Sequence, residues 1–360
     1  MPIYMDYHHF PGVTVEDVKK AHMADKQMQD KYGVKYHQFW VNQEAGTIFC
    51  LIEGPNPEAC ENVHKEAHGD VACNIVEVEA GLVDAFMGKG HKVDHGIVYY
   101  KDGKIDTGFR FILIVDILAK TDQANVSDMR RFKTPRLARN AVFEIVDKNK
   151  GTEVKNISDD SIIVVFNEAA VAYQCARGIQ KLLSENRDIE FRIGLTEGQP
   201  VTHSDGFFED AIDYTKQLAL LANNGEIVLS KDFSKLLIYK REKSIANIKI
   251  VSETQQKFIE RFFEYTEKNL SNENFSIGNI SQDMGISRPQ VYRKIIALTG
   301  RSPLHFVRDI KMKIAMNLIK ENKLSISEIA YELGYSNPSY FSKNFKSKFG
   351  VSPSQIMLAS

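Results

Sequence analysis

The chain has 360 residues, 43% of them hydrophobic and 26% charged, so it is long enough for two or three domains with buried cores. Its four cysteines, Cys50, Cys60, Cys73 and Cys175, have no paired spacing, which argues against a disulfide-stapled scaffold and fits a reducing compartment. The sequence shows no signal-peptide pattern and no run of about 18 apolar residues, so we expect a cytoplasmic protein without a membrane partner.

Charge and histidine are unevenly distributed along the chain, although the formal net charge is only −1. From Glu273 to Ser360 there are 12 Lys and Arg against 6 Asp and Glu, which gives +6 and leaves −7 for the remainder. A basic end of this kind suits a polyanion such as nucleic acid. Eight of the ten histidines lie within the first 95 residues, and such clustering suggests metal binding at that end.

Residues 1–90 predict a small domain of strands and helices. Period and turn residues indicate strands over 2–7, 34–41, 47–53 and 74–79, and helices over 14–32 and 58–68. The resulting order, βαββαβ, predicts a ferredoxin-like sandwich.

Two histidine spacings in this domain suit metal binding. His64 and His68 are four residues apart on the second helix, so both rings project from one face, and His22 and Asp25 form a similar pair on the first helix. Imidazole with a thiolate or carboxylate suits zinc, nickel or copper better than calcium or magnesium. The alternative is that the helix ending at His68 presents an ordinary solvated face. Strand alternation would put only one of His8 and His9 on the helix-covered side.

The N-terminal segment also resembles a family of small bacterial ferredoxin-like proteins with nickel-binding members. The resemblance rests on Met5-Asp6-Tyr7-His8-His9, on Ala21-His22-Met23-Ala24-Asp25, and on Ile48 to Pro55 continuing through Val63-His64. It implies a metal-sensing domain in which His9, His22, Cys50 and His64 are the leading ligands, with Asp25 and His68 as further candidates. Nickel or another transition metal would be the bound ion, and a small organic effector remains the alternative.

Residues 106–240 predict an α/β domain. The nearly unbroken apolar run 111–118 indicates a strand covered on both faces, and strands are also expected over 162–166, 191–195 and 226–229, with helices over 168–183 and 210–222. Asp116 interrupts the first strand, and Asp160 precedes the second. An aspartate in an apolar strand is costly unless it is paired, so these two carboxylates could share a divalent ion.

This middle segment resembles class III nucleotide cyclase domains. The resemblance follows Ile114-Val115-Asp116-Ile117, Asp159-Asp160-Ser161, Arg192 to Val201 and Gly225 to Ser230, in the family's order. It implies that Asp116 and Asp160 are the metal-binding carboxylates. The positions of the family's transition-state asparagine and arginine hold Asp213 and Gln217, and the base-selecting lysine is replaced by Asn156. These departures imply a degenerate scaffold, kept for homodimerisation, rather than an enzyme. The alternative is an active nucleotide cyclase with a DNA-binding tail.

The C-terminal segment, residues 252–360, contains one motif twice. Gly285-Ile286-Ser287-Arg288-Pro289 to Gly300-Arg301-Ser302-Pro303 recurs as Gly334-Tyr335-Ser336-Asn337-Pro338 to Gly350-Val351-Ser352-Pro353, at offsets of 49 and then 50 residues. Helices are expected over 252–270, 277–284, 287–298, 303–321, 325–333 and 336–349, after a linker over 240–249. This pattern predicts an all-α tandem helix-turn-helix domain.

Each copy pairs a turn glycine, Gly285 or Gly334, with a serine, Ser287 or Ser336, that can cap the following helix. The outward side chains of the two helices can hydrogen-bond base edges or phosphates. They are Arg288, Gln290, Tyr292, Arg293 and Lys294 in the first copy, and Asn337, Ser339, Tyr340, Ser342, Lys343 and Lys346 in the second.

The run Leu324 to Ser336, with Tyr340 to Lys346 and Phe349 to Pro353, resembles the signature of AraC/XylS-type transcription regulators. The resemblance covers about 100 residues. It implies two recognition helices that enter promoter DNA about 10 bp apart. Lys343 stands where the family often has arginine, and lysine contacts phosphate more readily than it forks onto guanine. The sequence as a whole therefore predicts a multidomain α+β regulator of transcription.

Overall fold

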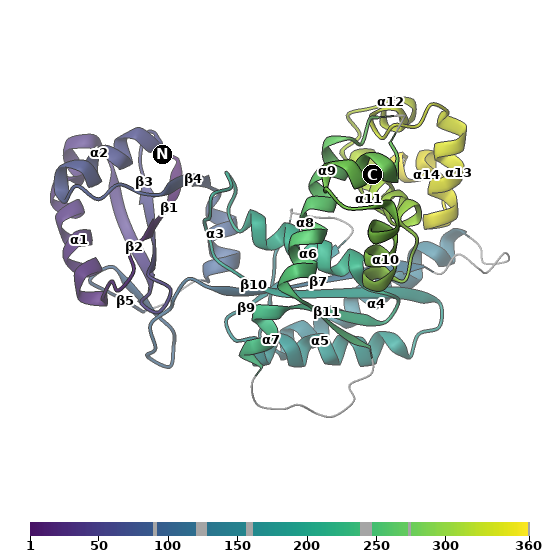
Figure 1. Ribbon diagram of the computed structural model, residues 1–360. Coiled ribbons are helices and arrows are strands. Elements are labelled where there is room, and N and C mark those ends of the chain that lie inside the picture. The colour runs from purple at the N-terminus through teal and green to yellow at the C-terminus, as the bar shows by residue number, and fades with distance from the viewer. Residues whose placement is uncertain (89–91, 120–127, 156–160, 238–246, 273–274, 359–360) are drawn as a thin grey trace.

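The computed structural model describes the chain apart from residues 89–91, 120–127, 156–160, 238–246, 273–274 and 359–360 (Figure 1). It contains two six-stranded sheets and, after them, a cluster of helices that ends at α14. Within these described ranges, no helix has both the length and the apolar character needed to cross a bilayer.

The first sheet carries the histidine-rich segment. Its elements are β1 (Ile3–His9), α1 (Val15–Met28), a 3-10 helix (Gln29–Tyr32), β2 (Lys35–Asn42), β3 (Thr47–Glu53), α2 (Pro57–Ala67) and β4 (Asn74–Val78). They follow the predicted order, with β1 antiparallel to both β3 and β4, and β2 antiparallel to β3. Thr14 begins α1 with a capping box to Asp17, as its position before the apolar period predicts.

Three further elements follow that were not predicted, and two of them are strands that extend this sheet. They are α3 (Ala80–Met87), β5 (Lys92–Asp94) and β6 (Ile97–Tyr99), and they complete the strand order β4-β1-β3-β2-β6-β5. Helices α1 and α2 cover one face of the sheet, whereas α3 lies on the other side, toward the second sheet (Figure 1).

The second sheet has the strand order β12-β11-β10-β7-β9-β8. Its elements are β7 (Arg110–Ala119), α4 (Asp128–Lys148), β8 (Thr152–Glu153), β9 (Ser161–Phe166), α5 (Ala169–Ser184), β10 (Ile189–Gly198), α6 (Glu209–Leu221), β11 (Glu226–Ser230), α7 (Lys231–Leu236) and β12 (Ile248–Val251). Helix α4 was not predicted. The expected linker over 240–249 requires a correction at its end, because Ile248 begins a strand that pairs in parallel with β11.

The two sheets share a core. Helices α4 and α5 cover one face of the second sheet, and the opposite face packs with α6, α3 and the first sheet in one apolar cluster that includes Trp40, Phe86 and Ile114. Arg110 is fully buried beside this cluster, where it donates to Asp106 at 2.8 Å and to the Phe86 carbonyl at 2.6 Å. The N-terminal and middle domains are thus joined by packed side chains as well as by the chain.

The C-terminal helices are α8 (Glu253–Lys268), α9 (Ile277–Asp283), α10 (Arg288–Thr299), α11 (Pro303–Glu321), α12 (Ile326–Glu332), α13 (Pro338–Phe349) and α14 (Pro353–Met357). The long helix α11 belongs to two cores, because Phe306 and Ile310 pack with α8 to α10, whereas Met312 and Ile319 pack with α12 to α14. It therefore joins the two copies of the motif rigidly, as predicted.

The two recognition helices, α10 and α13, begin differently. Ser287 caps α10 as predicted, but the cap of α13 is Asn337, whose side chain accepts from the Ser339 and Tyr340 amides. The prediction of Ser336 as a cap is therefore wrong. The extra residue of the second copy shifts the cap by one position and places Pro338 at the first helical residue, where a missing N–H costs nothing.

Candidate metal cavity and candidate DNA-binding surface

A cavity of about 140 Å³ lies between the helix-covered face of the first sheet and helices α1 and α2. Strand alternation supplies its floor, since Asp6 and His8 are two residues apart on β1 and Asp6 is in register with Cys50 on β3. The helices supply the rest. The polar residues of the wall are His8, Asp17, His22, Asp25, Cys50, His64, His68 and Asp70.

His64 lies between two buried carboxylates. Its Nε2 is 2.8 Å from Asp6 Oδ2, and its Nδ1 is 3.2 Å from Asp25 Oδ1. His8 Nε2 is 3.2 Å from the same Asp6 oxygen, and His68 Nε2 is 3.1 Å from the same Asp25 oxygen. The contacts to Asp25 Oδ1 are within ion-pairing distance but lack hydrogen-bond alignment. Two groups of three potential ligands, Asp6-His8-His64 and Asp25-His64-His68, therefore share one imidazole.

The charges in the cavity depend on the position of His64 between the two carboxylates. Burial favours the neutral form of His64, but the carboxylates of Asp25 and Asp6 outweigh it and raise the pKa of His64 to about 10. Burial likewise opposes ionisation of Asp6, yet His8 and His64 hold the pKa of that carboxyl well below its usual value. In the metal-free protein, a protonated His64 therefore bridges two ionised carboxylates.

His22 is different, because its imidazole is held neutral. The side chain is 2% exposed, and neither ring nitrogen has a hydrogen-bond partner among the described residues. Burial is the main cause that lowers the pKa of His22, to about 4. A β-carbon added at Gly96 would lie 2.4 Å from His22 Nε2, so only glycine fits there. A buried, neutral, unpartnered imidazole is the form that ligates metal, and such orphaned groups are rare without a reason.

These residues fit a transition metal. The ligand atoms within each group of three lie within 4.8 Å of one another, which is compatible with convergence on one ion. Imidazole nitrogens with carboxylate oxygens are ligands that nickel, zinc and copper accept. Burial raises the pKa of the Cys50 thiol well above its usual value, so in the metal-free protein Cys50 is a neutral thiol.

The structure brings most of the predicted ligands together and separates one. His22, Asp25, Cys50, His64 and His68 all line the cavity, whereas His9 is exposed because alternation turns it to the other face of β1. His8 lines the cavity in its place. Asp6 is a buried partner that the sequence analysis missed. Its position two residues before His8, on a strand with one covered face, was the available signal.

In the middle domain, the predicted metal carboxylate Asp116 has a cationic partner from another domain. Lys313 of α11 donates to Asp116 Oδ2 at 2.5 Å, and Ser161 donates to Oδ1 at 2.5 Å. Asp160 lies outside the described residues, as does Asn156. Asp213 is exposed on α6 and pairs with Lys216 at 2.7 Å. The carboxylate expected to hold a divalent ion is thus neutralised by an ammonium group.

The candidate DNA-binding surface comprises the outward faces of α10 and α13. In α10, Val291 and Ile295 are fully buried, and in α13, Phe341 and Phe345 are fully buried, as predicted. The outward residues are exposed, apart from a half-buried Ser342; they are Arg288, Gln290, Tyr292, Arg293, Lys294, Asn337, Ser339, Tyr340, Lys343 and Lys346. Because the inward residues form the core, the exposed outward side chains are free to reach a nucleic acid.

Three of these side chains have a second, structural role. Gln290 accepts from the Ser287 amide at 2.8 Å, and the Asn337 side chain caps α13. The Arg288 guanidinium packs so closely on Gly278 that a β-carbon there would lie 2.3 Å from it. Among the described residues, Arg293, Tyr292 and Lys343 have no comparable role, and Tyr340 has a ring contact with Tyr335 only. These four are the stronger candidates for direct DNA contact.

Comparisons with known proteins assign both ends of the chain. Residues 4–78 match the family model described as nickel responsive protein SCO4226-like, and residues 280–358 match a helix-turn-helix domain model. The N-terminal segment is therefore similar to a family of nickel-responsive proteins, and the C-terminal segment is similar to helix-turn-helix domains.

Individual relatives and solved structures are each similar to a part of the chain. A transcriptional activator of Rhizobium meliloti, RhrA, is 34% identical over 92 residues, which cover 25% of this chain and 29% of the activator. The SCO4226 structure from Streptomyces coelicolor is 39% identical with a TM-score of 0.21, and covers 21% of this chain and 94% of that one. A structure of an adenylate/guanylate cyclase/hydrolase from Silicibacter pomeroyi is 20% identical with a TM-score of 0.31, and covers 36% of this chain and 78% of that one. The chain spans less than a third of the length of the first curated relatives that it matches.

Proposed function

We propose that this protein is a sequence-specific DNA-binding regulator of transcription, and that nickel or another transition metal bound in the N-terminal cavity is its effector. Double-stranded promoter DNA is its partner through α10 and α13. The observation that carries the proposal is the buried group around His64 in a domain that matches a nickel-responsive family. The alternative effector is a small organic molecule. It would have to fit a cavity of about 140 Å³ and compensate two buried, ionised carboxylates, and this requirement disfavours it.

The residues of the cavity would act in defined ways on metal binding. Asp6, His8, His22, Asp25, His64 and His68 are the candidate ligands, and a bound divalent ion would supply positive charge to the two buried carboxylates. A ligating nitrogen must be unprotonated, so the His64 imidazolium would release one of its two ring protons to solvent when the ion binds. The closed group of side chains would draw α1, α2 and β1 together.

A packed path connects this cavity to the DNA-binding surface. The strand that carries Asp6 and His8 also places Met5 and Tyr7 in the core shared with α3, the second sheet and α6. Helix α6 in turn contributes Leu218 and Leu221 to the core of the first helix-turn-helix unit. A rearrangement of β1 thus has continuous side-chain contacts through which to bias the position of α10.

The middle domain serves as a scaffold in this proposal. Asp116 is occupied by Lys313, and α6 carries Asp213 and Gln217 where cyclases need an asparagine and an arginine. We therefore infer that the domain has a cyclase-like fold without cyclase activity. We also infer that the N-terminal domain is a ferredoxin-like sandwich, since its first four strands have the order β4-β1-β3-β2 with both helices on one face. Homodimerisation remains a prediction for analytical ultracentrifugation.

Isothermal titration calorimetry on the untagged full-length protein tests the effector. Nickel, zinc and copper are each titrated into the wild type, the His64→Ala variant and a control, His37→Ala. His37 lies outside the cavity, on β2, and pairs with Glu53. We expect saturable binding of at least one metal to the wild type and the control, and its loss in His64→Ala. Equal binding by all three proteins would remove the cavity from the proposal.

A further inference from the structure

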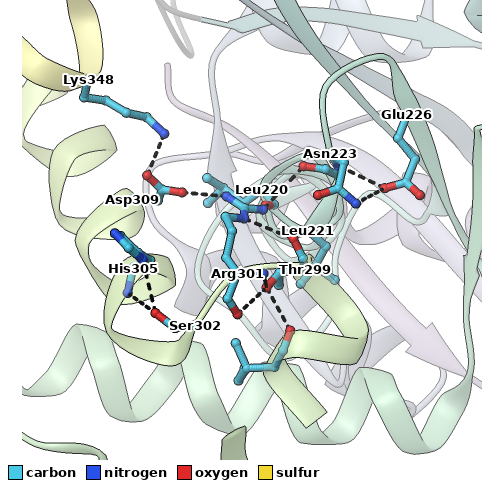
Figure 2. Close-up of polar contacts among 12 residues, drawn as sticks. Leu220, Leu221, Asn223, Glu226, Thr299, Arg301, Ser302, His305, Asp309 and Lys348 are labelled. Carbon is cyan, nitrogen blue, oxygen red and sulfur yellow. Dashed lines mark hydrogen bonds and ion pairs between the residues drawn. The ribbon is translucent and has the colours of Figure 1, made fainter. Parts of the chain in front are cut away.

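A second cavity, of about 80 Å³, lies between the middle domain and the DNA-binding domain. The middle domain contributes Asp116, Ile117 and Arg192 to its wall, and the DNA-binding domain contributes Asp309, Lys313 and Lys348. The two domains are held together beside it by a polar contact in which Arg301 donates to the Leu220 carbonyl, at the end of α6, and to Asp309 (Figure 2). The cavity exists only when these domains are docked.

Positive charge exceeds negative charge around this cavity. Arg192, Lys313 and Lys348 give +3 and Asp116 and Asp309 give −2, so the wall carries +1. Arg301, which pairs with Asp309 at 2.6 Å, raises the local sum to +2. The two carboxylates are already used, since Asp116 pairs with Lys313 and Asp309 pairs with both Lys348 and Arg301. A cation is therefore left over.

Arg192 is that cation. It lies on β10 opposite Asp116 in the sheet register, and its Nε is buried without a hydrogen-bond partner. Among the described residues, no hydrogen bond or ion pair of its guanidinium is found. Burial, and next the charge of Arg192, lower the pKa of Arg301. Burial opposes ionisation of Asp116, but Lys313, Ser161 and then Arg192 lower its pKa, so Asp116 is shared by two cations. The Arg192 side chain is half-buried, and its buried Nε–H lacks an acceptor, which is costly. A planar fork of N–H donors fits the oxygens of a phosphate.

We propose that this interdomain cavity binds one phosphate group, as inorganic phosphate or as the end of a small phosphorylated molecule, between Arg192 of the middle domain and Lys348 of the DNA-binding domain. A volume of about 80 Å³ holds several water-sized groups and therefore a phosphate, but it is far below the roughly 300 Å³ at which pockets for larger ligands begin. Because the anion contacts both domains, its binding stabilises the docked arrangement. This inference is independent of the metal effector.

The test is calorimetric titration of the full-length, metal-free protein with inorganic phosphate and, separately, with glycerol phosphate. Binding of either one supports the site, and the tighter of the two identifies the source of the phosphate group. Arg192→Gln and Lys348→Met should each weaken binding by about tenfold or more, as expected when a hydrogen bond to a charged group is lost. Arg187→Gln is the matched control, because Arg187 is an exposed arginine outside the cavity.

Two results would overturn the proposal. One is the absence of binding by both probes. The other is binding that survives Lys348→Met and Arg192→Gln unchanged, which would assign the phosphate to the recognition helices instead. If Arg192→Gln does not fold, as judged by circular dichroism, the Lys348→Met variant decides alone, since Lys348 is only half-buried near the end of α13.

Discussion

The pairing of Lys313 with Asp116 makes a specific prediction about stability. Replacing Lys313 by methionine keeps a side chain of about the length of the lysine's aliphatic part and removes its charge. Among the described residues, Ser161 is then the hydrogen-bond donor left to the Asp116 carboxylate, and Arg192 lies opposite it in the sheet. Because Asp116 is 8% exposed, water from the adjoining cavity replaces the lost ammonium group only in part.

The exposure of the pair sets the magnitude. The Lys313 side chain is 20% exposed and that of Asp116 is 11% exposed, so the pair belongs with buried rather than surface ion pairs. Removal of one partner from a buried pair costs about 3 kcal/mol or more, whereas a surface pair contributes at most about 1 kcal/mol. We therefore expect Lys313→Met to lower the free energy of unfolding by about 3 kcal/mol.

Urea unfolding followed by circular dichroism measures this change. Arg308→Met is the matched control, since Arg308 is an exposed cation on the same helix, and it should change the free energy by less than about 0.5 kcal/mol. The double variant Lys313→Met, Asp116→Asn should be more stable than the two single losses predict, because the stranded charge is gone. A Lys313→Met variant as stable as the control, or additive losses, would refute the assignment of this contact.

Three further predictions follow from other contacts. In gel-shift assays, Arg293→Ala and Lys343→Ala should each weaken DNA binding and reduce its salt dependence, and unchanged affinity and salt slope in both would exclude these contacts. Asn337→Ala should cost about 1 kcal/mol in thermal unfolding through loss of the α13 cap, and a cost equal to that of Ser336→Ala would contradict the assigned cap. Burial opposes ionisation of Asp309, but Lys348 and Arg301 outweigh it and lower its pKa. The stability that this carboxylate contributes is thus present above the unfolded pKa of about 3.9 and is lost as the pH falls through the lower folded pKa. The difference in free energy of unfolding between wild type and Asp309→Asn should hold from about pH 7 to 5 and shrink below about pH 4; a constant difference would contradict the shift.

Local patterns predicted the elements well because their causes are local. The repeated glycine, serine and proline positions identified α9 to α13, and the i, i+4 spacing of His64 and His68 placed both rings in one cavity. Features that depend on tertiary packing were not predicted, or were predicted wrongly. Helix α4 has only a weak amphipathic pattern and carries an internal Pro135.

The missed contacts are those that depend on tertiary packing. Asp6 and His8 reach the cavity through strand register, and His9 leaves it for the same reason. Lys313 and Asp116 are 197 residues apart, and only the docking of two domains brings them together. A charge count of each segment shows that cations are available in the C-terminal domain, but it cannot show which of them will face DNA and which will face another domain.

The most direct test of the central claim is the affinity of the full-length protein for DNA selected from a random pool, measured by fluorescence anisotropy with and without nickel. The account predicts that nickel changes the dissociation constant by roughly 5-fold to 150-fold, the usual range of coupling between two sites. It also predicts that His64→Ala binds the same DNA but no longer responds to nickel. An unchanged dissociation constant in the wild type, at nickel concentrations that calorimetry shows to be saturating, would contradict the claim that this cavity controls DNA binding.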